Sequence, residues 1–264
     1  MRTPSENWLL TPIQRVGQIP VSVIGNMGRM GIFLFQALYY SFAPPLKFYR
    51  VLKQIRFIGF DSLLVIVLTG AFTGMVLGFQ GYYTLSRVGS TAFLGPMVAL
   101  ALLRELGPVM AALMVTGRAG SAVTAELGIM RITEQIDELE ILGLSPHRYL
   151  VVPNFLAALI TVPLLTAIFN VVGIFGGYLV GGKLLGVNSG TYFGSMSDYV
   201  DMKDVLAGLY KSICFGGVIA WVCCFKGYTA GFGAEGVSRA TTQAVVMTSV
   251  LILIFDYFLT SVLF

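Results

Sequence analysis

The feature that most constrains this sequence is a series of long apolar stretches that charged residues rarely interrupt. Apolar residues make up 56% of the 264 residues and charged residues only 11%, whereas a soluble domain carries roughly 25% charged residues. A helix crosses a bilayer with about 20 mostly apolar residues. We therefore predict an all-α integral membrane protein, with spanning helices at about 58–82, 91–117, 150–180, 205–226 and 243–263.

Residues 19–43 are also apolar, but they include Asn26 and Arg29. An arginine at the centre of a spanning helix is costly, and a helix that lies in the membrane interface avoids that cost. We therefore predict an interfacial or re-entrant elbow helix over residues 19–43. Residues 1–18 are predicted to be a polar, poorly ordered segment, and residues 19–264 a single membrane domain.

Lysine and arginine residues are distributed unevenly between the two ends of the predicted spans. Most of them, including the basic run at 47–56, fall on the side of the N-terminus, and the opposite side holds only Arg87, Lys183 and Lys203. Basic residues are enriched in cytoplasmic loops, so the N-terminus is predicted in the cytoplasm and the C-terminus on the far side. The net charge of +4 then suits an anionic membrane surface, and no nucleic-acid partner is predicted.

Two triplets of glycine repeat every four residues inside predicted spans. The triplets are Gly70, Gly74 and Gly78 in the first span, and Gly173, Gly177 and Gly181 in the third. Such stripes of small residues let helix backbones approach closely in lipid. We expect both helices to pack tightly.

Arg104 and Glu105 lie near the middle of the second span, where ionisable side chains are costly. Adjacent residues on a helix point about 100° apart, so each of them needs a partner from elsewhere. Candidate partners are Asp61, Lys211 and Asp256, and the sequence does not assign the pairs. A functional role and a purely structural ion-pair network both remain open.

The segment between the second and third spans has the pattern of an amphipathic helix. Its apolar residues recur at spacings of three and four, at Ile129, Ile132, Ile136, Leu139 and Leu142. Such a helix can offer its charged face to a cytoplasmic partner or can be a solvated connection. The pattern alone favours neither interpretation.

No catalytic or metal site is predicted in this chain. With His147 as its one histidine, the chain lacks the pair of an HExxH zinc motif. The run Gly177–Lys183 matches the glycines and lysine of a phosphate-binding loop, but Leu184 stands where a serine or threonine must reach magnesium. We therefore predict that this chain does not hydrolyse ATP.

Four motifs resemble those of a known family. They are LLRELGPV at 102–109, GRAGSAVTAELG at 117–128, MRITEQIDELEILG at 130–143 and GVSRATT at 236–242. They resemble the MlaE-type permeases, the membrane subunits of ABC transporters that move phospholipids between the inner and outer membranes of Gram-negative bacteria and so maintain outer-membrane lipid asymmetry. The resemblance runs from about residue 20 to the end of the chain.

The resemblance implies a multi-pass inner-membrane protein with a periplasmic C-terminus, acting as a homodimer. Its implied partners are two ATPase subunits, which would bind ATP and magnesium, a hexameric MCE-domain substrate-binding protein and a small STAS-domain protein. This chain itself would hold no cofactor.

The resemblance also implies two sites. A coupling helix at about 124–143 would dock on the ATPase, through Glu126, Met130, Arg131, Glu134, Gln135 and Glu138. A phospholipid would lie in a cavity at the dimer centre near Arg104 and Glu105, and we expect Leu77, Gln80 and Leu106 close to it. The direction of transport and the headgroup preference stay open.

Two other functions are compatible with the residues. One is a secondary transporter driven by an ion gradient, with Arg104, Glu105, Asp61 and Asp256 as a relay. The other is a membrane scaffold that transports nothing.

Overall fold

The computed structural model describes residues 10–42 and 48–263, with side chains for residues 24–41 and 48–263. The described residues form helices and connecting turns, without β-strands. The α-helices are α1 (Leu10–Phe42), α2 (Phe48–Ile58), α3 (Leu63–Ser86), α4 (Leu94–Ala101), α5 (Gly107–Val115), α6 (Ser121–Ile132), α7 (Gln135–Ile141), α8 (Val152–Tyr178), α9 (Ser189–Tyr199), α10 (Met202–Tyr228) and α11 (Gly233–Leu263). Shorter 3₁₀ segments cover Phe60–Ser62 and Thr91–Phe93, and π-helical segments cover Leu102–Leu106, Thr116–Gly120, His147–Val151 and Leu179–Leu184.

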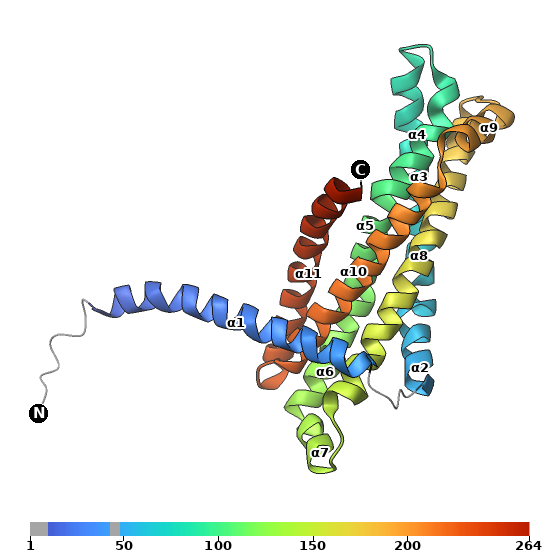
Figure 1. Ribbon diagram of the computed structural model, residues 1–264. Helices are drawn as coiled ribbons and strands as arrows, with labels where there is room; N and C mark the ends of the chain where they lie inside the picture. The colour runs from blue at the N-terminus through green and yellow to red at the C-terminus, as the bar shows by residue number, and fades with distance from the viewer. Residues whose placement is uncertain (1–9, 43–47, 264) are drawn as a thin grey trace, which may run out of the picture.

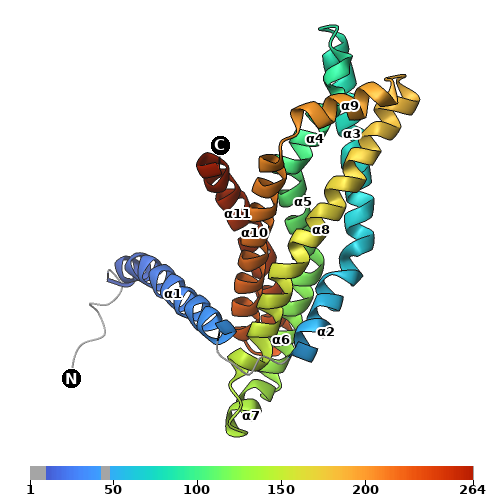
Figure 2. The same ribbon diagram turned by 45° about the vertical axis from the view of Figure 1, so that its right-hand side comes forward.

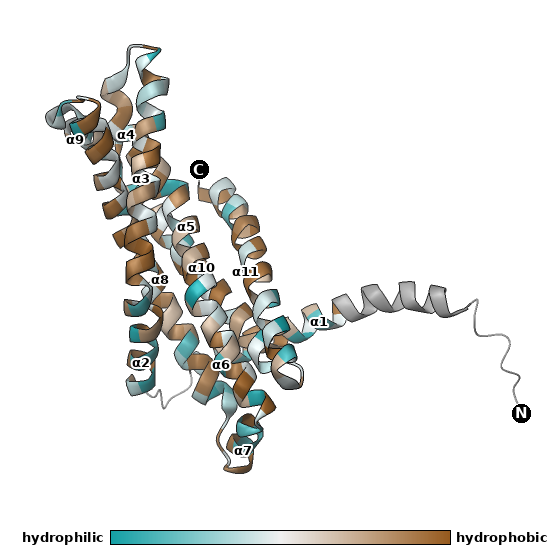
Figure 3. Cartoon of the chain, turned by 180° about the vertical axis from the view of Figure 1, so that it is seen from behind, coloured by the Kyte–Doolittle hydropathy of each residue, from teal (hydrophilic) through white to brown (hydrophobic). Residues whose placement is uncertain are grey.

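Five helical segments among the described residues are long and apolar enough to cross a membrane, as predicted. They are Phe48–Ser86, Thr91–Ile132, His147–Leu184, Met202–Tyr228 and Gly233–Leu263. These segments run side by side as a bundle, with α7 and the start of α2 at one end and α9 at the other (Figure 1). Apolar residues fill the middle of α3 and α8, as Figure 3 shows. We refer to the two ends of the bundle as the α7 end and the α9 end.

Helix α1 lies across the bundle and projects away from it near α6, as Figures 1 and 2 show. It begins at Leu10, so the helix predicted over residues 19–43 starts nine residues earlier, within the segment predicted as polar and poorly ordered, and residues 1–9 lie outside the described residues. The reason can be read in the sequence, because Leu10, Ile13 and Val16 continue an apolar helical spacing. Contact with the bundle comes from the second half of α1, where Met30, Phe33 and Ala37 are buried.

The segment predicted as one coupling helix over 124–143 is two helices, so the prediction of a continuous helix is wrong. Helix α6 continues the second span to Ile132, and α7 starts after Glu134, whose φ of 60° lies in the left-handed region. The turn buries Ile136 completely and brings Arg131 Nη1 within 2.5 Å of Asp137 Oδ1. In a straight helix those two residues would be about 9 Å apart along the axis.

Helix α9 was not predicted, because its sequence is polar and contains several small residues. Its first turn is capped by Asn188, whose Oδ1 accepts a hydrogen bond of 2.8 Å from Gly190 N. Tyr192 anchors it, because this side chain is completely buried and its hydroxyl donates to the carbonyl oxygen of Ile174 on α8. A buried tyrosine thus attaches the connection between the third and fourth spans to the bundle.

The two predicted glycine stripes face each other where α3 packs along α8. A Cβ atom on Gly74 would overlap the carbonyl oxygen of Gly173, and one on Gly78 would lie 2.7 Å from that of Gly177. A Cβ on Gly70 would lie 3.0 Å from the carbonyl oxygen of Phe169. The backbones are therefore closer than any side chain at these positions would allow, which confirms the predicted tight packing.

We expect Gly74→Ala to destabilise the protein by about 1–3 kcal/mol, because the added methyl group forces the α3 and α8 backbones apart. The matched control is Gly31→Ala in α1, where a Cβ would meet nothing within 4 Å. That change should be neutral or stabilising by up to about 1 kcal/mol, because alanine favours the helix. The measurement is the free energy of unfolding in mixed detergent micelles, and equal effects of the two changes would contradict the close contact.

Candidate functional site

A local departure from α-helical geometry in the second span positions the charged pair. Residues Leu102–Leu106 are π-helical, and Pro108 follows in the first turn of α5. Proline has no backbone N–H, so the carbonyl oxygen of Arg104 lacks its usual partner four residues later. The ammonium of Lys211 on α10 fills that place and donates to this oxygen at 2.9 Å. The proline therefore creates the acceptor that a side chain from another span then satisfies.

Lys211 is the centre of a charged network that joins three spans. Its side chain is completely buried, and its Nζ atom lies 2.7 Å from Glu105 Oε2 and 3.0 Å from Asp256 Oδ1 on α11. The same Nζ donates to Thr260 Oγ1 at 2.8 Å. A buried ammonium needs such complete pairing, because removing it from water is costly.

Arg104 belongs to a second ion pair beside the first. Its Nε atom lies 2.7 Å from Oδ1 of Asp204, a nearly fully buried residue in the first turn of α10. Asp204 Oδ2 also accepts a hydrogen bond from Asp201 N in a capping box, so the start of α10 holds this carboxylate in place. Arg104 and Glu105 thus pair with different residues, because adjacent positions on a helix point in different directions.

Two of the three candidate partners of the charged pair belong to its network, and one does not. Lys211 and Asp256 belong to the network, whereas Asp61 pairs with Arg118 at 3.1 Å. Arg118 also donates to the carbonyl oxygen of Phe57, so this contact attaches the start of the first span to the second span. Asp61 does not contact the Arg104–Glu105 pair.

The network has an excess of negative charge and an exposed side. Three carboxylates, those of Glu105, Asp204 and Asp256, face the two cations Lys211 and Arg104. Side-chain exposure is 40% for Arg104 and 39% for Glu105. The network can therefore hold the spans together and also meet a charged group from outside the chain.

The other residues predicted near a lipid lie at different distances from this network. Leu106 is half-buried and belongs to the same π-helical segment. Leu77 is half-buried and Gln80 is exposed on α3, which packs against α8 and α4 rather than against α10 and α11. Within a single chain, Leu106 therefore lies beside the charged pair, whereas Leu77 and Gln80 lie on a helix that does not pack against α10 or α11.

The residues predicted to dock on an ATPase lie at the α7 end. Glu126, Glu134, Gln135 and Glu138 are exposed, and Met130 and Arg131 are half-buried. Of the predicted apolar face, Ile136 is buried, whereas Ile129 and Leu142 are exposed. Ile141 is 85% exposed. This segment therefore presents apolar side chains beside carboxylates, as protein interfaces commonly do.

Asp204 and Thr260 belong to the charged network, although no sequence motif predicted them as site residues. A local signal exists for each, because Asp201 and Asp204 have capping-box spacing before an apolar run, and Thr260 lies one helical turn after Asp256. Neither signal identifies the distant partner, since Arg104 and Asp204 are 100 residues apart.

We expect Lys211→Met to destabilise the protein by about 3–5 kcal/mol, because it leaves Glu105 and Asp256 without their cation. The matched control is Lys203→Met, which removes an exposed lysine from the same helix and should change stability by less than about 0.5 kcal/mol. Adding Glu105→Gln and Asp256→Asn to Lys211→Met should recover much of the loss. Unfolding in mixed micelles measures all three effects, and a harmless Lys211→Met would show that the network does not stabilise the fold.

Comparison with known proteins shows which family this chain resembles. The model of the family described as "Permease MlaE" matches residues 51–262. A "Probable ABC transporter permease protein" of Rickettsia bellii is 44% identical over 97% of this chain and 99% of its own length. The "Intermembrane phospholipid transport system permease protein MlaE" of Haemophilus influenzae is 42% identical over 96% of this chain and 97% of its own. The chloroplast protein TRIGALACTOSYLDIACYLGLYCEROL 1 of Arabidopsis thaliana is 37% identical over 81% of this chain and 61% of its own. This multi-pass chain therefore belongs to the MlaE permease family.

Proposed function

We propose that this chain is the permease subunit of an ATP-driven transporter that moves phospholipids between the inner and outer membranes and so maintains outer-membrane lipid asymmetry. The printed name of the Haemophilus influenzae relative, a phospholipid transport permease, supports the substrate class. The observation that carries the proposal is that one span bears both candidate sites. Segment Thr91–Ile132 contains Arg104 and Glu105, ends with α6, and is followed by α7 after the turn at Glu134.

The proposed orientation places the α7 end in the cytoplasm and the C-terminus in the periplasm. It is supported by Arg56, Arg118, Arg131 and Lys226, which lie at or near the α7 end. Helix α1 then lies in the cytoplasmic interface of the inner membrane as an elbow helix. Its crosswise position and the exposure of Asn26 and Arg29 suit this place, because headgroups and water can solvate both side chains.

The proposed assembly has two copies of this chain. Helices α3 and α11 expose apolar side chains, among them Phe72 and Val76 on α3 and Val250 and Leu253 on α11. A second copy packed on these faces would enclose a cavity between the copies, into which Leu77, Gln80 and Leu106 could contribute. Two ATPase subunits, which bind ATP and magnesium, would dock at the α7 end. A hexameric MCE-domain protein would receive or supply the lipid at the other end, and a STAS-domain protein would join the complex.

The proposed mechanism uses the second span as the connecting element. Closure of the ATPase subunits would push α7 and shift α6, which packs against α10 and α11. That shift would move the π-helical segment relative to Lys211 and change the ion pairs of Arg104 and Glu105. The charged pair would then either contact the lipid headgroup or stabilise one of the two states, while apolar side chains hold the acyl chains.

A second candidate function, transport driven by an ion gradient, is favoured by one observation. Glu105, Lys211, Asp256 and Thr260 form a continuous hydrogen-bonded chain that could relay a proton. In that mechanism transport needs no ATPase and stops when the gradient is collapsed. A non-transporting scaffold would tolerate substitutions in the network without any loss of lipid transfer.

We expect Glu134→Lys combined with Glu138→Lys to reduce the ATPase that co-purifies with this chain by at least about tenfold. Reversal of two exposed charges places like charges across the proposed interface, which costs several kcal/mol. Asp198→Lys, on the exposed surface of α9 at the other end, is the matched control and should retain the ATPase. Undiminished ATPase in the double variant would remove α7 from the interface.

We expect Glu105→Gln to leave the complex assembled and to reduce ATP-driven lipid transfer by about tenfold. A neutral amide binds the Lys211 ammonium about 1.4 kcal/mol less strongly than a carboxylate does, which corresponds to that factor. The measurement is transfer of labelled phospholipid from proteoliposomes, with ATP hydrolysis by the same preparation as the internal control. Transfer that persists without ATP but ceases when the ion gradient is collapsed would instead favour the gradient-driven carrier.

A further inference from the structure

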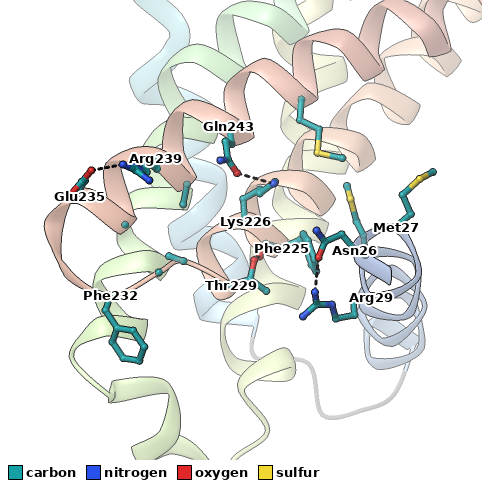
Figure 4. A pocket seen from close by; sticks show the side chains of 16 residues that line it. Asn26, Met27, Arg29, Phe225, Lys226, Thr229, Phe232, Glu235, Arg239 and Gln243 are labelled. Atoms are coloured by element: carbon teal, nitrogen blue, oxygen red, sulfur yellow. Dashed lines mark hydrogen bonds and ion pairs between the residues drawn. The ribbon is translucent and has the colours of Figure 1, made fainter. Parts of the chain in front are cut away.

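A cavity of about 720 Å³ lies at the α7 end, outside both sites discussed above. It lies between α1 and the consecutive helices α10 and α11, as Figure 4 shows. Helix α1 contributes Asn26 and Arg29, the end of α10 contributes Phe225 and Lys226, and the start of α11 contributes Arg239. No motif of the sequence analysis predicted this cavity.

The polar side of the cavity carries more positive than negative charge. Arg239 is paired with Glu235 at 2.6 Å, the one carboxylate in the lining. Arg29 Nη2 donates to Asn26 Oδ1 at 2.6 Å, and Lys226 Nζ donates to Gln243 Oε1 at 3.1 Å. Within the described part of the chain, neither Arg29 nor Lys226 forms an ion pair with a carboxylate.

This charge arrangement fits a phosphate group. Guanidinium and ammonium groups bind phosphate oxygens through charge-assisted hydrogen bonds, which are stronger than bonds to neutral amides. The amide partners of Arg29 and Lys226 can be replaced by an anion at small cost, because an amide oxygen left behind at an open cavity can be solvated. Both cations are therefore available to one anionic group that enters between α1 and α10.

The remaining lining favours a lipid over a free anion. Met27, Met30, Phe225 and Met247 give the cavity an apolar wall. Phosphate bound at the cationic side would thus place acyl chains along an apolar helix surface, whereas inorganic phosphate would leave that surface unused.

Phe232 lies at the edge of the cavity and is 97% exposed. An exposed apolar ring beside basic residues suits a surface that lies in the membrane interface. Lys226 and Lys211 lie 15 residues apart on α10, which is about 22 Å along a helix. The cavity is therefore separate from the charged network. It lies close to the membrane surface at the α7 end of the bundle.

We propose that this cavity binds the phosphate headgroup of an anionic phospholipid from the leaflet at the α7 end, with Arg29 and Lys226 as its ligands. A lipid bound there would bridge α1 to α10 and α11. Within the bundle, α1 is held by the buried side chains of Met30, Phe33 and Ala37 and by the hydrogen bond from Trp221 Nε1 to Met30 O at 2.8 Å. The bound lipid would add polar contacts to this apolar attachment. Binding at this site does not depend on the proposed transport function.

The experiment is native mass spectrometry of the purified full chain, titrated with phosphatidylglycerol or with phosphatidylcholine in the same detergent. We expect the protein to retain phosphatidylglycerol preferentially. Arg29→Gln combined with Lys226→Gln should weaken phosphatidylglycerol binding by about tenfold or more, because two charge-assisted bonds are lost. Lys53→Gln, which removes an exposed cation of α2 at the same end, is the matched control and should bind like the unaltered protein.

A charge-preserving variant and a competition with inorganic phosphate complete the experiment. The swap Arg29→Lys with Lys226→Arg preserves both charges and should restore binding to within about twofold, which excludes loss of binding through misfolding. Excess inorganic phosphate should not displace the lipid, because it makes no apolar contact. Equal binding of phosphatidylglycerol by the double glutamine variant would overturn the proposal. So would full displacement of the bound lipid by inorganic phosphate.

Discussion

The burial of one ammonium group determines how half of this bundle is assembled. Lys211 belongs to the fourth span and lies between the second and fifth, where its Nζ contacts Glu105, Asp256, Thr260 and the carbonyl oxygen of Arg104. A cation without these partners could not remain buried at that depth. The partners must therefore meet at one point, and Pro108 contributes by leaving the backbone acceptor open.

The other half of the bundle is held by contacts of the opposite kind. Where α3 meets α8, glycine backbones touch, and the close approach replaces side-chain interdigitation. The second span connects the two halves, because α5 packs on both α8 and α10 while α6 packs on α10 and α11. A chain built in this way has one apolar, closely packed pair of helices and one charged trio, joined by a span with two π-helical segments. Such segments frequently mark functional positions in helices.

Charged groups in this permease occupy three levels along the bundle. The exposed carboxylates of α7 lie at one end, the cationic cavity between α1, α10 and α11 lies beside them, and the Lys211 network lies farther along α10 toward the α9 end. At the α7 end, a lipid headgroup in the cavity would therefore contact positive charge, whereas a protein bound to α7 would contact negative charge. This difference separates the surface suited to an ATPase from the cavity suited to a lipid phosphate.

The sequence by itself determined the five spans, the close approach at the glycine stripes and the need of Arg104 and Glu105 for partners on other helices. Hydropathy and helical period are local properties, and they depend little on distant residues. Only the tertiary structure decided that Arg104 pairs with Asp204, that Asp61 pairs with Arg118, that the chain turns at Glu134 and that a cationic cavity forms beside α1. The ion pairs and the cavity join residues up to more than 200 positions apart, and which side chains meet is set by how whole helices pack rather than by any short stretch of sequence.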